Sequence, residues 1–208
     1  IRNYRRDFMC GAAANLSIGQ GTLLVTPLQV AHMMSGVANG YLPRLQLIKQ
    51  IQDGNANVVY APKPQEVQRP LPAYERALSS VRKGMREVVE AGTGGRARLS
   101  YASIAGKSGT AQWGPEREDK RLAWFAGFMP CDNPRFAYVV LYEGRAHERL
   151  GGGAAAAPIV KEFFETEKKD IKAIIDPPKD DIPVAEPVEE TPETAAAALR
   201  ERSGAPAV

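Results

Sequence analysis

Cysteine and histidine are scarce in this sequence, which has two residues of each among its 208. Cys10 and Cys131 are too few for a disulfide framework, and neither lies in a CxxC or other metal-ligand spacing. His32 and His147 have no partner pattern for a metal site or for a catalytic triad. We therefore expect no metal centre, two buried thiols and two structural or exposed histidines. A single long-range disulfide stays open as an alternative.

Long apolar runs are also absent. No stretch approaches the roughly 20 apolar residues that cross a bilayer, and the opening IRNYRRDFMC has no apolar centre of a signal peptide. The sequence does not begin with Met. We expect a fragment of a longer protein. The absence of a membrane anchor from this sequence therefore does not show whether the full-length protein has one.

Acidic and basic residues are unevenly distributed along the chain, whose formal net charge is +3. Eight acidic and three basic residues follow position 175, so residues 176–208 carry about −5 and residues 1–175 about +8. The basic residues are scattered without interleaved aromatics, which favours a solvated surface and no nucleic-acid partner. Repeated Pro, Glu and Ala predict a disordered acidic tail over 176–208, with ETAAAALRER as its helix-forming stretch.

Two amphipathic helices are predicted before position 100. Thr26 as N-cap and Pro27 at the first helical position begin one helix, which ends within 36–40. Its expected buried residues are Leu28, Ala31, Met34 and Val37. The second helix ends near Gly92, and its expected apolar face contains Leu78, Val81, Met85, Val88 and Val89.

Strand signals dominate the rest of the chain. Alternation around Asp53 predicts a hairpin, and PKPQEVQRPLP at 62–72 predicts a linker. Three β-prone runs at 101–113, 122–130 and 135–144 predict consecutive antiparallel strands. A glycine run then precedes a closing helix, whose amphipathic stretch Ile159, Val160, Phe163 and Phe164 opens at Pro158. Residues 1–175 should form one α+β domain, with helices covering a mainly antiparallel sheet.

The stretch IAGKSGTAQW at 104–113 contains a Gly-Lys-Ser with two alternative interpretations. A phosphate-binding loop requires another glycine five residues before Gly106, where this sequence has Tyr101. It also requires a helix after the lysine, but residues 109–113 continue a strand pattern. We therefore interpret the stretch as a strand.

A strand that reads Lys-Ser-Gly is typical of acyl-transfer sites of the penicillin-recognising type. The lysine charge attracts a substrate carboxylate and assists proton transfer at a serine, and the following hydroxyl hydrogen-bonds that carboxylate. Glycine leaves space for the substrate, and the strand edge pairs with an extended peptide. Lys107, Ser108 and Gly109 are therefore candidate site residues.

Five stretches together resemble the transpeptidase domain of class B penicillin-binding proteins, especially the elongation-type group called penicillin-binding protein 2. In family order they are NLSIGQGTLLVTPLQVAHMMSGVANG at 15–40, VRKGMREVVEAGTGGRA at 81–97, AGKSGTAQ at 105–112, AWFAGFMP at 123–130 and GGGAAAAPIVKEFF at 151–164. The resemblance implies the C-terminal portion of a penicillin-binding transpeptidase fold, which is also that of serine β-lactamases.

The resemblance also implies a function. It implies a peptidoglycan D,D-transpeptidase that cross-links stem peptides through a serine acyl-enzyme, is inhibited by β-lactams, and needs no cofactor or metal. Lys107, Ser108 and Thr110 take catalytic roles, and the substrate-binding residues are Lys107, Ser108, Gly109, Thr110, Ala111 and Gln112. The implied partners are a membrane glycosyltransferase and elongation-complex proteins. The implied location is the outer side of the cytoplasmic membrane, with an anchor upstream of this sequence.

The sequence departs from the family pattern at the nucleophile. The family's SxxK and SxN motifs precede the SIGQG stretch, and neither is recognisable there. SVRK at 80–83 fits SxxK as a string but follows SIGQG, so we interpret it as an exposed helix turn. The chain on its own should therefore lack the nucleophile. Two alternatives stay open, a non-catalytic penicillin-recognising sensor or scaffold and a soluble β-lactam-hydrolysing enzyme.

Some other residues have both a functional and a purely structural interpretation. Glu116, Glu118 and Asp119 offer carboxylates that could pair for acid/base catalysis, but a solvated turn at the rim of the site is expected. The two tryptophans should pack on the sheet, with groove lining as the alternative for Trp113. The glycine-rich loop 92–95 with Thr93 is a candidate for anion binding, and the resemblance implies that it borders the site in a supporting role.

Overall fold

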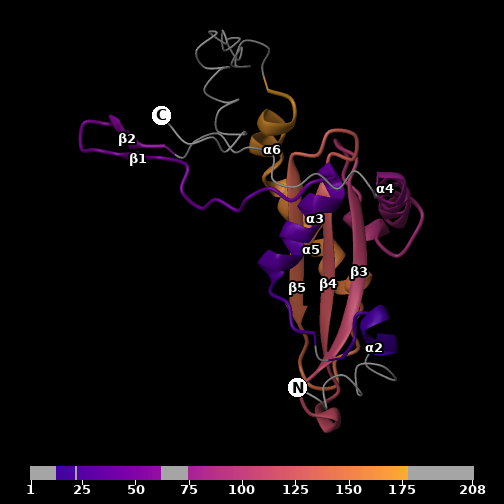
Figure 1. The fold of residues 1–208 in the computed structure, drawn as a ribbon. Coiled ribbons are helices and arrows are strands. Elements are labelled where there is room, and N and C mark those ends of the chain that lie inside the picture. The colour runs from indigo at the N-terminus through magenta and orange to yellow at the C-terminus, as the bar shows by residue number, and fades with distance from the viewer. Residues whose placement is uncertain (1–12, 22, 62–74, 178–208) are drawn as a thin grey trace, which may run out of the picture. The chain divides into compact units, whose positions relative to one another are not determined.

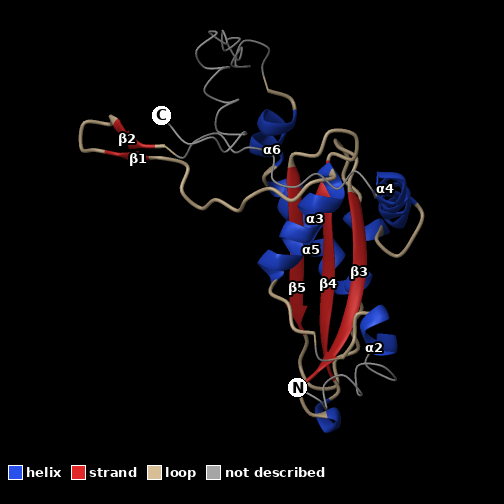
Figure 2. Ribbon diagram, in the orientation of Figure 1, coloured by secondary structure: helices blue, strands red, loops and turns tan. Residues whose placement is uncertain are grey.

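A three-stranded antiparallel sheet forms the centre of the computed structural model, which describes residues 13–21, 23–61 and 75–177 (Figure 1). The strand order is β3–β4–β5, with bounds Ala105–Trp113, Lys120–Met129 and Phe136–Glu143 (Figure 2). Helices pack on both faces, which confirms the predicted α+β class. Strand β3 starts later than predicted, at Ala105. Tyr101 lies outside the strand, and its hydroxyl donates a hydrogen bond to the Phe164 carbonyl at 2.8 Å.

Strand β4 is buried on both faces. Successive side chains of a strand point to opposite faces. Ala123, Phe125 and Met129 share a cluster with helix α5 (Gly152–Thr166). Ala126 and Phe128 share another with helices α3 (Pro27–Asn39) and α4 (Glu75–Glu90). None of these five residues is more than 4% exposed. The apolar sequence of β4 follows from this double burial.

Helix α3, Pro27–Asn39, begins and ends where the sequence predicts. The Thr26 hydroxyl accepts a hydrogen bond from the Gln29 amide at 3.3 Å, and the Gln29 side chain accepts one from the Thr26 amide at 2.8 Å. This reciprocal capping box fixes the start of the helix. Gly40 ends it in the left-handed region, at φ 77°.

The buried face of α3 differs from the prediction at its first turn. Met34 and Ala38 are buried, whereas Leu28 is 57% exposed. Positions spaced by three residues drift about 60° around a helix at each step, so Leu28 and Val37 lie on opposite sides. The four-residue spacing of Met34 and Ala38 stays closer to one face.

Helix α4, Glu75–Glu90, confirms the second predicted helix. Met85 and Val89 are its buried residues, in the C-terminal half where the helix packs on β3. Val81 was expected on the same face but is 46% exposed, whereas Leu78, one turn before it, is half-buried.

The remaining elements are short. They are α2 (Ala13–Ser17), β1 (Ile51–Gln52), β2 (Val58–Tyr60), η3 (Gly95–Ala97), η4 (Glu116–Glu118) and α6 (Lys168–Ile175). The β1–β2 hairpin confirms the turn predicted around Asp53, whose carboxylate accepts hydrogen bonds from the amides of Asn55 and Asn57 at 2.9 Å. The side chain of Asn57 contributes most to lowering the pKa of Asp53.

Helix α5, Gly152–Thr166, starts earlier than predicted. It begins within the glycine run that was expected to precede it, and Pro158, where the predicted amphipathic stretch opens, lies inside the helix. Proline has no N–H to donate to the carbonyl four residues earlier, which belongs to Ala154. Arg96 supplies the missing donor, with its Nη1 3.2 Å from the Ala154 oxygen. The Ala154 carbonyl therefore keeps a hydrogen-bond donor, although Pro158 has no N–H to give it.

Some predictions fall on residues outside the described ranges. These residues are Cys10, the linker at 62–72 and all of the acidic tail after Pro177, so the division into 1–175 and 176–208 stays a prediction. Cys131 has a free thiol. Among the described residues, no helix has the length and apolar character required to cross a membrane.

Two glycines allow the first turn of α5 to approach its neighbours closely. A Cβ atom at Gly152 would overlap the Trp124 carbonyl oxygen of β4, and one at Gly153 would overlap the Thr93 carbonyl oxygen. A side chain at either position would therefore push the helix away from the sheet or from the loop after α4.

We expect Gly153→Ala to lower the free energy of unfolding by about 1–3 kcal/mol, because the added methyl group overpacks a backbone contact. Urea unfolding followed by circular dichroism measures the change. Gly151→Ala is the matched control, since nothing lies within 4 Å of the Cβ that it adds. Equal destabilisation by the two variants would contradict the packing role of Gly153.

Candidate active site

Strand β3 carries the whole Lys-Ser-Gly stretch at an edge of the described sheet. It pairs with β4 on one side only, so its other edge is open within the described residues. The strand interpretation of this stretch is confirmed. Along this strand the exposed residues are Lys107, Thr110 and Gln112, and the half-buried residues are Ser108, Gly109, Ala111 and Trp113.

Two carbonyl groups of β3 face the open edge, where side chains contact them. Lys107 Nζ donates to the Ser108 oxygen at 2.5 Å, and Gln20 Nε2 donates to the Thr110 oxygen at 3.2 Å. In an antiparallel strand, the N–H and C=O of one residue point to the same side. The N–H of Thr110 therefore also points to the open edge. A backbone donor in this position suits an oxyanion.

Both hydroxyl groups of the stretch receive contacts from other segments. Ser108 Oγ lies 3.0 Å from Thr93 Oγ1, in the loop after α4. Thr110 Oγ1 accepts a hydrogen bond from the Gly152 amide at 3.3 Å. A hydroxyl has one donor and two acceptor positions, so Thr110 keeps its own proton for another acceptor.

A groove of about 360 Å³ lies beside β3. Its walls are residues 18–21 and 23–25, the α3 residues Val30 and Met34, and side chains of β3 and β4 that include Trp113. Trp113 therefore fits its groove-lining interpretation. Lys120 Nζ lies over its ring, 5.1 Å from the centroid.

The loop that carries Gln20 is shaped by two glycines. Gly19 and Gly21 have φ angles of 75° and 102°, which residues with a Cβ rarely adopt. The Gln20 amide also donates to the Asn15 carbonyl at 2.8 Å. This tight turn places the Gln20 side chain against Thr110, a contact across 90 positions that the sequence does not predict.

The SVRK string lies on α4, as expected from its place after SIGQG. Ser80 and Lys83 are both exposed. The Ser80 hydroxyl donates to the Arg76 carbonyl at 3.1 Å, a bond within the helix. Ser80 therefore has the environment of an ordinary helix serine.

The charged turn between β3 and β4 has internal partners. Lys120 Nζ lies 2.6 Å from the Glu118 carboxylate, and Arg121 lies 3.2 Å from that of Asp119. Glu116 is exposed. This arrangement fits the interpretation as a solvated turn.

The two histidines have backbone contacts. His32 Nε2 lies 2.7 Å from the Pro43 carbonyl oxygen, and the His147 amide donates to the Glu118 carbonyl at 2.9 Å. Among the described residues, no group of His, Cys, Asp and Glu has the geometry to hold a metal ion.

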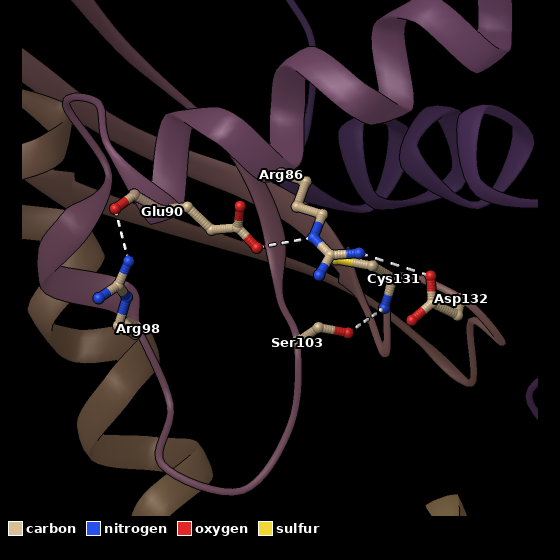
Figure 3. A network of polar contacts seen from close by, with 6 residues as sticks. All are labelled: Arg86, Glu90, Arg98, Ser103, Cys131 and Asp132. Atoms are coloured by element: carbon tan, nitrogen blue, oxygen red, sulfur yellow. Dashed lines mark hydrogen bonds and ion pairs between the residues drawn. The ribbon is translucent and has the colours of Figure 1, made fainter.

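Cys131 belongs to a polar network between α4 and the turn after β4 (Figure 3). Arg86 Nε lies 2.6 Å from the Glu90 carboxylate, and its Nη1 lies 3.6 Å from that of Asp132. The Cys131 amide donates to Ser103 Oγ at 3.0 Å. Burial raises the pKa of the Cys131 thiol, so it stays protonated and is a poor nucleophile.

Comparison with known proteins shows which family the chain belongs to. Residues 5–165 match the penicillin binding protein transpeptidase domain. The chain belongs to this family. The match confirms the resemblance noted in the sequence, and with it the fold class.

Relatives of this family support the same assignment. The peptidoglycan D,D-transpeptidase MrdA of Haemophilus influenzae is 30% identical over 181 residues, which cover 79% of this chain and 27% of that protein. The peptidoglycan D,D-transpeptidase PbpA of Mycolicibacterium smegmatis is 31% identical over 148 residues, covering 69% and 29%. The chain thus spans less than a third of either relative.

A solved structure shows the same fold. It is penicillin-binding protein A of M. tuberculosis in a ceftriaxone acyl-enzyme complex, with a TM-score of 0.67 and 27% identity. The match covers 76% of this chain and 36% of that chain.

We expect Thr110→Val to lower the free energy of unfolding by about 1–3 kcal/mol, because it leaves the buried Gly152 amide without its acceptor. Thermal or urea unfolding measures this loss. Thr110→Ser restores the acceptor and should restore most of the stability. If valine and serine variants were equally unstable, the contact with Gly152 would not be the cause.

Proposed function

We propose that the chain forms one wall of a peptidoglycan D,D-transpeptidase site, with a serine nucleophile that lies outside this sequence. The observation that carries the proposal is the arrangement along the open edge of β3. One ammonium group, two hydroxyls and one outward-pointing N–H come from the four consecutive residues 107–110. Membership of the family and the D,D-transpeptidase relatives support it.

The proposed reaction consists of two acyl transfers. The serine oxygen attacks the carbonyl carbon between two D-alanines of a stem peptide, forming a C–O bond. The C–N bond then breaks, and the terminal D-alanine leaves with the serine proton on its amine. An amine of a neighbouring stem peptide attacks the ester, forms the cross-linking amide and returns a proton to the serine oxygen.

Residues 107–112 have distinct roles in this reaction. The Thr110 N–H stabilises the tetrahedral oxyanion, and one such donor contributes about 3 kcal/mol in comparable sites. Lys107 and the hydroxyls of Ser108 and Thr110 bind the terminal carboxylate. Lys107 has three N–H donors and gives one to the Ser108 carbonyl, so two are available for substrate.

The open edge also accounts for binding of the rest of the peptide. Gly109 presents no side chain, so an extended substrate can approach the backbone. Ala111 and Gln112 continue the edge, where a peptide adds as a further strand. A β-lactam carries a similar carboxylate and reactive carbonyl, and it should acylate the same serine.

We further propose where the full-length protein acts and with what. A peptidoglycan substrate places this domain on the outer side of the cytoplasmic membrane, held by an anchor upstream of this sequence. The resemblance to the elongation-type group supports a membrane glycosyltransferase and elongation-complex proteins as partners.

We expect Lys107→Ala to slow acylation by a fluorescent penicillin at least tenfold in the full-length protein that carries this sequence. The variant loses the charge that attracts the carboxylate, and hydrogen bonds to charged groups contribute about 1.5–3 kcal/mol. The rate is read from time-resolved labelling on a denaturing gel.

Lys83→Ala and Ser80→Ala are matched controls on α4, and both should be labelled at the wild-type rate. Loss of labelling with Ser80→Ala would make SVRK the nucleophile motif and refute the proposed position of the serine. A folded wild-type protein that takes no label would refute the transpeptidase function and favour the scaffold alternative.

A further inference from the structure

Thr93 contacts the Lys-Ser-Gly stretch from a different part of the chain. Among the described residues outside β3, it is the one whose hydroxyl lies within hydrogen-bond distance of a hydroxyl in this stretch, at 3.0 Å from Ser108 Oγ. Thr93 is exposed and Ser108 is half-buried, so the pair lies at the surface. The sequence predicts only that this loop borders the site.

The backbone around Thr93 is held from three sides. The Gly94 amide donates to the Val88 carbonyl at 2.9 Å, which fixes the loop to the end of α4. A Cβ at Gly94 would lie 3.0 Å from the ring of Phe125, in the core of the sheet. Gly153 packs directly on the Thr93 carbonyl. The Thr93 hydroxyl therefore occupies a position set by α4, β4 and α5.

Two hydroxyls at this distance share one proton in a hydrogen bond and keep one for a third group. When Thr93 donates to Ser108 Oγ, the Ser108 proton is free to turn toward an acceptor at the open edge. Without Thr93, a serine hydroxyl tends to bond a nearby backbone group. The presence of Thr93 thus decides where the Ser108 proton is directed.

Thr110 receives an equivalent contact. Its oxygen accepts from the Gly152 amide and its proton stays available. Both hydroxyls of the stretch therefore have an acceptor position that a fixed group from outside β3 can fill. Ser108 depends for this on a side chain, which a substitution can remove.

We propose that Thr93 is a positioning residue for the substrate carboxylate in this reaction. Its hydroxyl donates to Ser108 Oγ and directs the Ser108 proton to the carboxylate that Lys107 attracts. The proposal rests on the transpeptidase function proposed above and adds to it a residue outside the Lys-Ser-Gly stretch.

The test compares two penicillins in the full-length protein that carries this sequence. Benzylpenicillin has a free carboxylate, and its methyl ester does not. We expect Thr93→Val to lower the acylation efficiency of benzylpenicillin about tenfold and that of the ester less than twofold. Thr93→Ser should restore the rate with benzylpenicillin. Thr166→Val, at the exposed end of α5, is the control for a threonine-to-valine change and should leave both rates unchanged.

A double-mutant cycle isolates the contact with Ser108. In a Ser108→Ala background, Thr93→Val should have no further effect on benzylpenicillin acylation. An equal loss for acid and ester, or full additivity of the two substitutions, would overturn the positioning role. Failure of the wild-type protein to react with either penicillin would instead refute the transpeptidase function itself, so the two failures are distinguishable.

Discussion

The close approach of helix α5 to strand β3 is the constraint on which the site depends. The Gly152 amide reaches Thr110 because residue 152 has no side chain between the helix and the sheet. The helix in turn is held by Ala156, Ala157 and Val160, which are at most 2% exposed. The burial of apolar side chains on one face of the sheet therefore sets the geometry of a polar edge. A substitution deep in this core would act on the site through the position of the first turn of α5.

The site is assembled from segments that are far apart in the sequence. Gln20 reaches β3 across 90 positions, Thr93 across 15 and Gly152 across 42. Each of these segments has its own reason for its local shape. Gly19 and Gly21 turn the first loop, Gly94 holds the second, and Gly152 begins a helix. Local sequence thus shapes each piece, and packing against the sheet brings the pieces together.

The sequence predicts the elements better than it predicts their contacts. Helix α3 has caps that are local signals, so both of its ends are predicted correctly. Helix α5 begins two residues earlier than predicted, and the donor that compensates for Pro158 is not predicted, because Arg96 belongs to another element. Leu28 is mispredicted because three-residue spacing does not stay on one helix face.

The same limit holds for the site. The residue types of the Lys-Ser-Gly stretch indicate its chemistry, since charge, hydroxyl and small size can be read directly. That Gln20 contacts Thr110 cannot be read from spacing, although the two glycines that flank it are a visible signal of a tight turn. The border position of Thr93 is predicted from family order, but its distance from Ser108 depends on how α4 and α5 pack.

The contacts of Gln20 and Lys107 have a consequence for the behaviour of the protein in solution. An unpaired strand edge is a template on which other chains can add, which leads to aggregation. Here the carbonyls of Ser108 and Thr110 are each covered by a side chain of the same molecule. A substrate peptide forms several hydrogen bonds with the edge at once, which compensates for displacing a long side chain from a carbonyl. A non-specific contact with another sheet edge forms fewer such bonds. We expect these two contacts to disfavour self-association through this edge, while the backbone groups stay available to a substrate peptide.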